Sequence, residues 1–199
     1  IHFSEKLLEM GSSFSNKVWN ASKFVLSNLE DFDYSTSVMD LEFKLEDRWI
    51  LSKLQSSSKK INEAMENYEL DTAAKTAYEF FRGDFCDWYV EIAKTRVYGN
   101  EGIDKITAQW ILRHVLDNGL RILHPFMPYI TEEIWQKVKL GDETIMLVEF
   151  PEEDKSLVDT NSEKEFDYLR EVITAIRNIR GEANVSPSRK IEVMFKTSK

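Results

Sequence analysis

Apolar residues recur every three or four positions through most of residues 1–140, and this period constrains the fold more than any other feature. In the first segment the repeating positions are Phe3, Leu7, Met10, Phe14, Val18, Ala21 and Val25. At about 100° per residue these positions share one side of a helix, so we expect that side to be buried. The chain has only 7 Gly and 4 Pro residues, which favours long helices over many turns.

Four further segments show the same helical period. Pro125 and Pro128 separate the last two of them, because proline interrupts an α-helix. Thr131 is the expected N-cap of the fifth helix, with two glutamates in its first turn. The apolar positions of the four segments are Leu45, Trp49, Ile50, Leu54, Ile61 and Met65; Ala74, Ala77, Phe81, Phe85, Trp88 and Ile92; Ile106, Trp110, Val115, Leu116 and Leu120; and Trp135 and Val138.

The pattern changes after residue 140. Thr144–Phe150 and Ile191–Phe195 have the composition of short strands, and they flank a helical segment, Glu163–Arg180. A strand, helix, strand order implies a small α/β unit. The predicted fold is therefore mainly α, with an antiparallel helix bundle over residues 1–140 and a small C-terminal α/β appendage over residues 141–199.

Composition limits the classes of protein to which the chain can belong. The single cysteine, Cys86, can form neither an internal disulfide nor a cysteine-based zinc cluster. No run of about 18 apolar residues is available to span a membrane. We therefore expect a cytoplasmic protein with no membrane partner.

The sequence contains no catalytic or phosphate-binding motif of a common type, such as Gly-x-Gly-x-x-Gly, His-Glu-x-x-His or Gly-x-Ser-x-Gly. The three histidines, at positions 2, 114 and 124, lie far apart in the chain. Cys86 follows Phe85 near an apolar stripe, so a buried and inert thiol is expected rather than a nucleophile. No catalytic residue and no metal site are predicted.

One segment is free of acidic residues, although the chain has 35 of them and a net charge of −9. It runs from Met10 to Leu29 and contains the sequence NKVWNASKF, residues 16–24. With Phe14 at the centre of the buried face, the residues on or beside the opposite face are Ser12, Asn16, Lys17, Trp19, Asn20, Lys23, Phe24 and Ser27.

These residue types suit a surface that binds RNA. Amides can read base edges, ammonium groups attract phosphates, and aromatic rings can stack on unpaired bases. A carboxylate on the same surface would repel the RNA backbone. The alternative is that Trp19 joins Leu8 and Leu26 in a second core stripe and that the acids are absent by coincidence.

The chain also resembles a known family. Six blocks, in the family's order, are similar to the C-terminal anticodon-binding region of the valyl-tRNA synthetases, which are class Ia enzymes. FCDWYVEIAK and NKVWNASKF are the most specific for this family, whereas HPFMPYITEEIW is shared with other class Ia enzymes, so the equivalent domain of an isoleucyl-tRNA synthetase is the alternative. The blocks are FSNKVWNASKFVL, LEDRWILSKL, YEFFRGDFCDWYVEIAKTRVY, ILHPFMPYITEEIWQKV, IMLVEFP and AIRNIRGEANVSPSRKI.

The resemblance implies a helix bundle that binds the anticodon stem-loop of valine tRNA. The parent enzyme attaches valine to that tRNA with ATP, and the resemblance places ATP and Mg²⁺ in a catalytic domain whose signature motifs are missing here. We therefore expect a fragment that is inactive alone and holds no cofactor. Its expected partners are valine tRNA and the catalytic domain of the same polypeptide, but not DNA, and a monomer is expected.

Family positions carry over to a first set of site residues on the anticodon-facing helix: Asn16, Lys17, Trp19, Asn20, Lys23 and Phe24. The chain departs from the family pattern at two places on this helix. The family usually has Gly-Arg-Asn-Phe where this chain has Gly-Ser-Ser-Phe at residues 11–14, and Lys23 stands where Arg is common. Lysine replaces a planar fork with a point charge.

A second basic cluster is a candidate for contact with the tRNA stem, although an exposed helix face explains the same residues. Its members are Arg177, Arg180, Arg189 and Lys190. A different class of function also remains open, because an exposed helical stripe can dock on protein instead of RNA. The chain would then be a helical interaction module.

Overall fold

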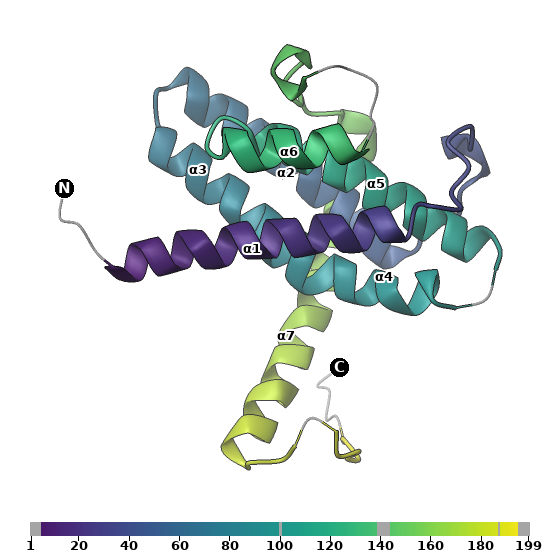
Figure 1. The fold of residues 1–199 in the computed structure, drawn as a ribbon. Helices are drawn as coiled ribbons and strands as arrows, with labels where there is room; N and C mark the ends of the chain where they lie inside the picture. Colours follow the sequence, from purple (N-terminus) through teal and green to yellow (C-terminus); the bar gives the residue numbers. More distant parts are fainter. Residues whose placement is uncertain (1–4, 100, 139–143, 187, 195–199) are drawn as a thin grey trace. The chain divides into compact units, whose positions relative to one another are not determined.

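The computed structural model of the protein describes residues 5–99, 101–138, 144–186 and 188–194. In these residues the structure is mainly α-helical and contains no strand (Figure 1). The α-helices are α1 (Glu5–Ser27), α2 (Leu45–Glu66), α3 (Leu70–Tyr78), α4 (Val90–Val97), α5 (Ile103–Leu123), α6 (Pro128–Val138) and α7 (Thr160–Glu182). A π-helical segment, Glu79–Tyr89, and short 3-10 turns at Val38–Asp40, Ile145–Leu147 and Lys155–Leu157 complete the regular structure.

By its internal contacts the chain divides into two compact units, residues 1–163 and 164–199, and each is considered by itself. These units are defined by contacts and do not test whether residues 1–140 and 141–199 are independent domains. The domain boundary near residue 140 therefore stays a prediction. The helical class predicted for the bundle is confirmed. The α/β appendage is not found, since neither predicted strand forms among the described residues.

In the first unit, α1 packs against the π-helical segment, α5 and α6. Figure 1 shows it between α6 on one side and α4 on the other. Four of the residues predicted to face inward, Phe14, Val18, Ala21 and Val25, are buried. Met10, predicted to belong to the same stripe, is 46% exposed, and Phe3 lies outside the described residues. Burying a side chain of the size of Phe14 or Val18 stabilises the fold by about 1.5–3 kcal/mol, so this stripe anchors α1 and leaves its opposite side exposed.

The predicted third helix is one continuous rod, but its middle is π-helical. The backbone stays in the right-handed helical region at both junctions, from α3 into the π-helix and from there into α4. A π-helix bonds residue i to i+5, so each turn holds more residues than an α-helical turn. The buried face therefore moves on by one residue: Tyr89 and Ala93 are fully buried, whereas Trp88 and Ile92, predicted to be inside, are half-buried.

Helix α6 starts four residues earlier than predicted, since an N-cap at Thr131 would make residue 132 its first helical position. Pro128 takes its first position, where a missing N–H costs nothing. Thr131 is not an N-cap but a buried residue within the first turns, and its hydroxyl lies 2.7 Å from Nδ1 of His124. The threonine thereby joins α6 to the end of α5.

The predicted strand Thr144–Phe150 is instead a 3-10 turn followed by irregular chain. Thr144 caps the turn by accepting a hydrogen bond from the Met146 N–H. The carboxylate of Glu132 accepts from the Thr144 hydroxyl at 2.8 Å and from the Ile145 N–H at 3.2 Å. Side-chain acceptors thus hold these backbone donors, and a β pattern without a partner strand does not form a sheet.

In the second unit, α7 ends in a Schellman motif. Asn184 takes the left-handed conformation, with φ of 51°. The N–H of Val185 donates to the carbonyl of Arg180 at 2.9 Å, and the Asn184 N–H donates to Gly181 at 3.1 Å. The chain that follows, through Met194, has no regular structure, and Phe195 of the predicted strand lies outside the described residues.

A buried ionic cluster joins α2 to the rod. The carboxylate of Asp47, in the first turn of α2, is fully buried. It accepts hydrogen bonds from Arg96 Nη1 at 2.6 Å, from the Tyr89 hydroxyl at 2.7 Å and from the Lys44 N–H at 3.0 Å. Burial, together with the Asp47 charge, holds the pKa of Tyr89 well above its ordinary value, so the hydroxyl keeps the proton that it donates.

Replacing Arg96 with alanine should destabilise the protein by about 3 kcal/mol or more, because Asp47 would be left as a buried charge without its cation. Urea unfolding measures the change. Lys94→Ala, in the same helix, removes a partly exposed pair with Glu91 and should cost less than about 1 kcal/mol. Equal losses in the two variants would contradict this role of the cluster.

Candidate nucleic-acid interface

The structure exposes the outer face of α1. Asn16, Trp19, Asn20 and Lys23 are exposed, while Lys17 and Phe24 are half-buried. Among the described residues, Lys23 has no carboxylate partner. Asn16, Asn20 and Lys23 are therefore available to a ligand. Trp19 is 37% exposed and lines a hollow together with Leu26, so its two predicted roles, in RNA binding and in a second apolar stripe, both stay predictions.

A hollow of about 210 Å³ lies between α1 and α6. Trp19, Lys23 and Leu26 line it from α1, and Ile134 and Lys137 line it from α6. The ammonium of Lys137 sits 4.5 Å from the centre of the Trp19 ring, which is a cation–π distance. Lys137 also pairs with the Glu133 carboxylate at 2.5 Å. This hollow therefore combines a partly exposed aromatic ring with one paired lysine and with Lys23, which has no carboxylate partner among the described residues.

A second hollow, of about 320 Å³, lies on the other flank of α1, against the rod. Lys17, Asn20 and Phe24 line it from α1, and Lys94 lines it from α4. The ammonium of Lys94 lies 5.7 Å from the centre of the Phe24 ring, and Tyr98 meets that ring edge to face at 6.2 Å. Asn20 and Lys23 thus stand on a ridge between two hollows that each contain an aromatic ring and lysines.

The acid-free segment does not make an acid-free surface. Asp87, from the π-helical segment, pairs with the ammonium of Lys17 at 2.5 Å. Glu91 lines the same hollow and pairs with Lys94 at 2.6 Å. The two lysines on this flank are therefore already neutralised, whereas Lys23 on the ridge is not paired within the described residues.

Sequence reasoning missed Lys137, Tyr98 and the two acids of this surface. They come from α6, from α4 and its C-cap, and from the π-helical segment, and only the tertiary fold brings them beside α1. No local spacing in the sequence carries that information. Lys94 lies in the last turn of α4, and its contact with Phe24 likewise depends on the tertiary fold.

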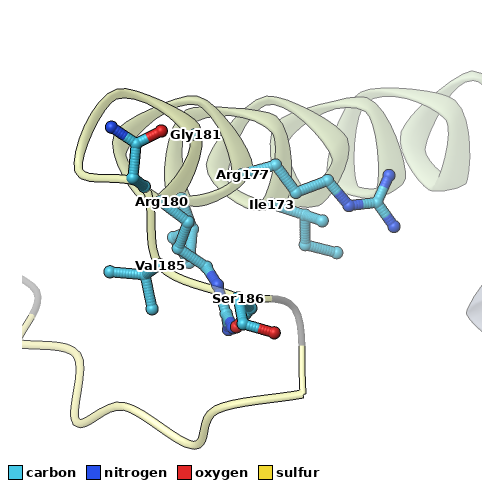
Figure 2. A pocket seen from close by; sticks show the side chains of 8 residues that line it. Ile173, Arg177, Arg180, Gly181, Val185 and Ser186 are labelled. Atoms are coloured by element: carbon cyan, nitrogen blue, oxygen red, sulfur yellow. The ribbon is translucent and has the colours of Figure 1, made fainter.

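The second basic cluster lies in the second unit, where its members have different surroundings. Arg180 reaches from α7 to the chain that follows it (Figure 2) and donates to the carbonyl oxygens of Ser186 and Arg189 at 2.5 and 2.9 Å. Arg177 and Arg180 line a cavity of about 720 Å³, while Arg189 and Lys190 are exposed outside its lining. Arg180 thus has a structural role, and contact of these residues with RNA stays a prediction.

Cys86 is buried and His114 is half-buried, and the pKa of each is shifted. Desolvation raises the pKa of Cys86 to about 12, so the thiol stays protonated, as predicted for an inert cysteine. Burial, reinforced by Arg121 and Arg113, lowers the pKa of His114 to about 4. Over the described residues, no cluster of three or more Asp, Glu, His or Cys side chains is arranged to hold a metal ion, and no helix is long and apolar enough to cross a membrane.

Comparison with known proteins identifies the family. The family model described as the anticodon-binding domain of tRNA ligase matches residues 47–195. The chain belongs to this family. This match begins near the start of α2 and does not include α1, whereas the relatives described next also match α1.

Valine–tRNA ligases match the whole chain, in their C-terminal anticodon-binding region. The enzyme of Fusobacterium nucleatum is 51% identical over all of this chain and 23% of its own length. Those of Fervidobacterium nodosum and Thermotoga maritima are 45% and 41% identical, over 92% and 98% of this chain and 21% and 22% of their own lengths. This anticodon-binding domain therefore spans about a fifth of the curated relatives that it matches.

A solved structure shows the same fold. The LeuRS of Agrobacterium radiobacter, crystallised in a ternary complex with tRNA and LeuAMS, superimposes with a TM-score of 0.56 over 80% of this chain and 18% of that one. Sequence identity is 19%, so the likeness concerns the helical fold of the domain alone.

The depressed pKa of His114 predicts how the stability of this domain depends on pH. The unfolded chain binds the proton below about pH 6.5, but the native state resists it until about pH 4. The free energy of unfolding should therefore fall as pH decreases between these values, by up to about 3 kcal/mol, and His114 should add nothing further below them.

Urea unfolding between pH 8 and pH 4 tests this, with His114→Gln as the variant that cannot titrate. The variant should lose most of the pH slope that His114 contributes. His124→Gln is the matched control, because His124 is less buried and its pKa is lowered less strongly. An unchanged slope in His114→Gln would show that this imidazole is not the group concerned.

Proposed function

We propose that the chain binds the anticodon stem-loop of valine tRNA through the outer face of α1. The observation that carries the proposal is the ridge of Asn20 and Lys23, exposed between the two hollows that flank it. The family and the valine–tRNA ligase relatives support an anticodon-binding role. The assignment to α1 rests on the chemistry of its exposed side chains.

In this proposal each part of the face has a distinct task. The Asn20 amide can donate to and accept from a base edge, and Lys23 attracts a phosphate. The exposed part of the Trp19 ring and the half-buried ring of Phe24 offer stacking surfaces, and stacking on an unpaired base is worth about 1–3 kcal/mol. Unpaired bases occur in a loop and not in a duplex, which favours the anticodon loop over the stem as the ligand of this face.

We also propose that the complete protein ligates valine to its tRNA, the activity for which the valine–tRNA ligase relatives are named. That reaction requires ATP, and the residues that bind ATP and Mg²⁺ would belong to parts of the protein other than this domain. The catalytic part of the same polypeptide is then a second partner. A cytoplasmic location follows from this role and stays a prediction.

The competing function is a helical module that docks on protein through the same face. The charge of Lys23 favours RNA, because a lysine without a carboxylate partner among the described residues suits a polyanion better than an apolar partner. The two functions differ in their response to salt and in the effect of reversing a single charge.

Replacing Lys23 with glutamate should weaken binding of a valine anticodon stem-loop by about tenfold or more, since an attraction to phosphate becomes a repulsion. Fluorescence anisotropy measures the affinity, and thermal unfolding should change little because Lys23 is exposed. Lys60→Glu, at an exposed position of α2, is the matched control and should bind like the wild type. Equal affinity in Lys23→Glu and wild type would remove this face from the proposal.

The affinity for the stem-loop should also decrease steeply with salt, because each phosphate contact releases counterions. In a plot of log affinity against log salt, Lys23→Gln should lower the slope by about 0.7, the value of one contact to a single strand. Titrations from low to physiological salt give both slopes. A shallow slope for the wild-type chain would favour the protein-docking alternative instead.

A further inference from the structure

A separate polar pocket of about 220 Å³ lies on the first unit and shares no lining residue with the two hollows beside α1. One stripe of α5 forms most of it, because positions 110, 113, 114, 117 and 121 recur at helical spacing. Trp135 of α6 and Val148 of the following chain close its other side. Nothing in the proposed tRNA contact uses these residues.

Three buried N–H donors of this lining have no acceptor among the described residues. They are Nε of Arg113, Nε of Arg121 and the indole Nε1 of Trp135. Trp135 is only 2% exposed, and a buried donor without an acceptor costs about 1–3 kcal/mol. All three lining groups that lack a partner are donors, so the pocket is complementary to a ligand that supplies acceptors.

The charges of the pocket favour an anionic acceptor. Asp117 pairs with Arg121 and leaves the charge of Arg113 without a carboxylate partner in the described chain. The guanidinium of Arg113 is held 4.9 Å from the centre of the Tyr34 ring, a contact that orients it without neutralising it. His114 stacks on Trp110 at 4.8 Å and stays neutral near physiological pH, and the Asp154 carboxylate nearby opposes the two arginines only in part.

We propose that this pocket is a phosphate-binding site in which Arg113, Arg121 and the Trp135 indole donate hydrogen bonds to one phosphate group. Guanidinium groups match the geometry of phosphate oxygens, and hydrogen bonds to a charged acceptor are the strong ones. The same chemistry is present in free phosphate, in a phosphomonoester and in the phosphodiester of a nucleic acid.

The test follows the indole N–H signals of the chain, which has 5 tryptophans, by two-dimensional NMR while phosphate is added. The signal lost in Trp135→Phe identifies Trp135. Inorganic phosphate up to tens of millimolar should move the Trp135 signal, at ionic strength matched with sodium chloride. Dimethyl phosphate in a parallel titration distinguishes the sources: a shift with both compounds indicates a phosphodiester, and a shift with inorganic phosphate alone indicates free phosphate or a monoester.

Arg113→Gln should weaken the phosphate affinity read from the Trp135 signal by about tenfold, the value of one charge-assisted hydrogen bond. Arg82→Gln is the matched control, because Arg82 also lies over a tyrosine ring, at 5.7 Å, but does not line this pocket. The readout is an affinity of folded protein, so a loss of stability in either variant does not imitate the result. A Trp135 signal that does not move, or an affinity that Arg113→Gln leaves unchanged, would mean that the pocket holds water only and would overturn the proposal.

Discussion

The buried carboxylate of Asp47 is the constraint on which the arrangement of the bundle depends. A charge removed from water is tolerable only when fixed donors surround it, and Arg96, Tyr89 and the Lys44 N–H do so at 2.6–3.0 Å. These donors come from α4, from the end of the π-helical segment and from the start of α2. The cluster therefore holds the rod against α2 in a single register, and the acids and lysines that the rod presents to α1 follow from that register.

The helical part of the fold was predictable because burial repeats with the period of the helix. Phe14, Val18, Ala21 and Val25 illustrate this, since each is buried as its spacing predicts. The burial of Tyr89 in place of Trp88 was not predictable, because a π-helix changes the period that the prediction assumes. The predicted C-terminal strands failed for a different reason: alternation shows that a strand could be half-buried, but not whether a partner strand exists.

The candidate site was predictable only as far as one helix supplies it. The exposure of Asn20 and Lys23 follows from their position opposite Phe14 on α1. The neighbours of that face could not be found in this way, because Asp87 and Lys137 reach it from segments far away in the chain. An acid-free stretch of sequence describes one helix, whereas a ligand meets a surface to which three elements contribute.

The pair of Lys17 with Asp87 has a thermodynamic consequence for any polyanion that approaches α1. Asp87 is a counter-ion that the polypeptide itself carries, held 2.5 Å from the ammonium. An incoming phosphate that displaced it would release no mobile ion into solution and would gain none of the mixing entropy that drives most contacts of this kind. The two lysines of α1 should therefore contribute differently to binding. Contact of a phosphate with Lys23 depends on the salt concentration, whereas contact with Lys17 is favourable only if the phosphate binds the ammonium better than Asp87 does.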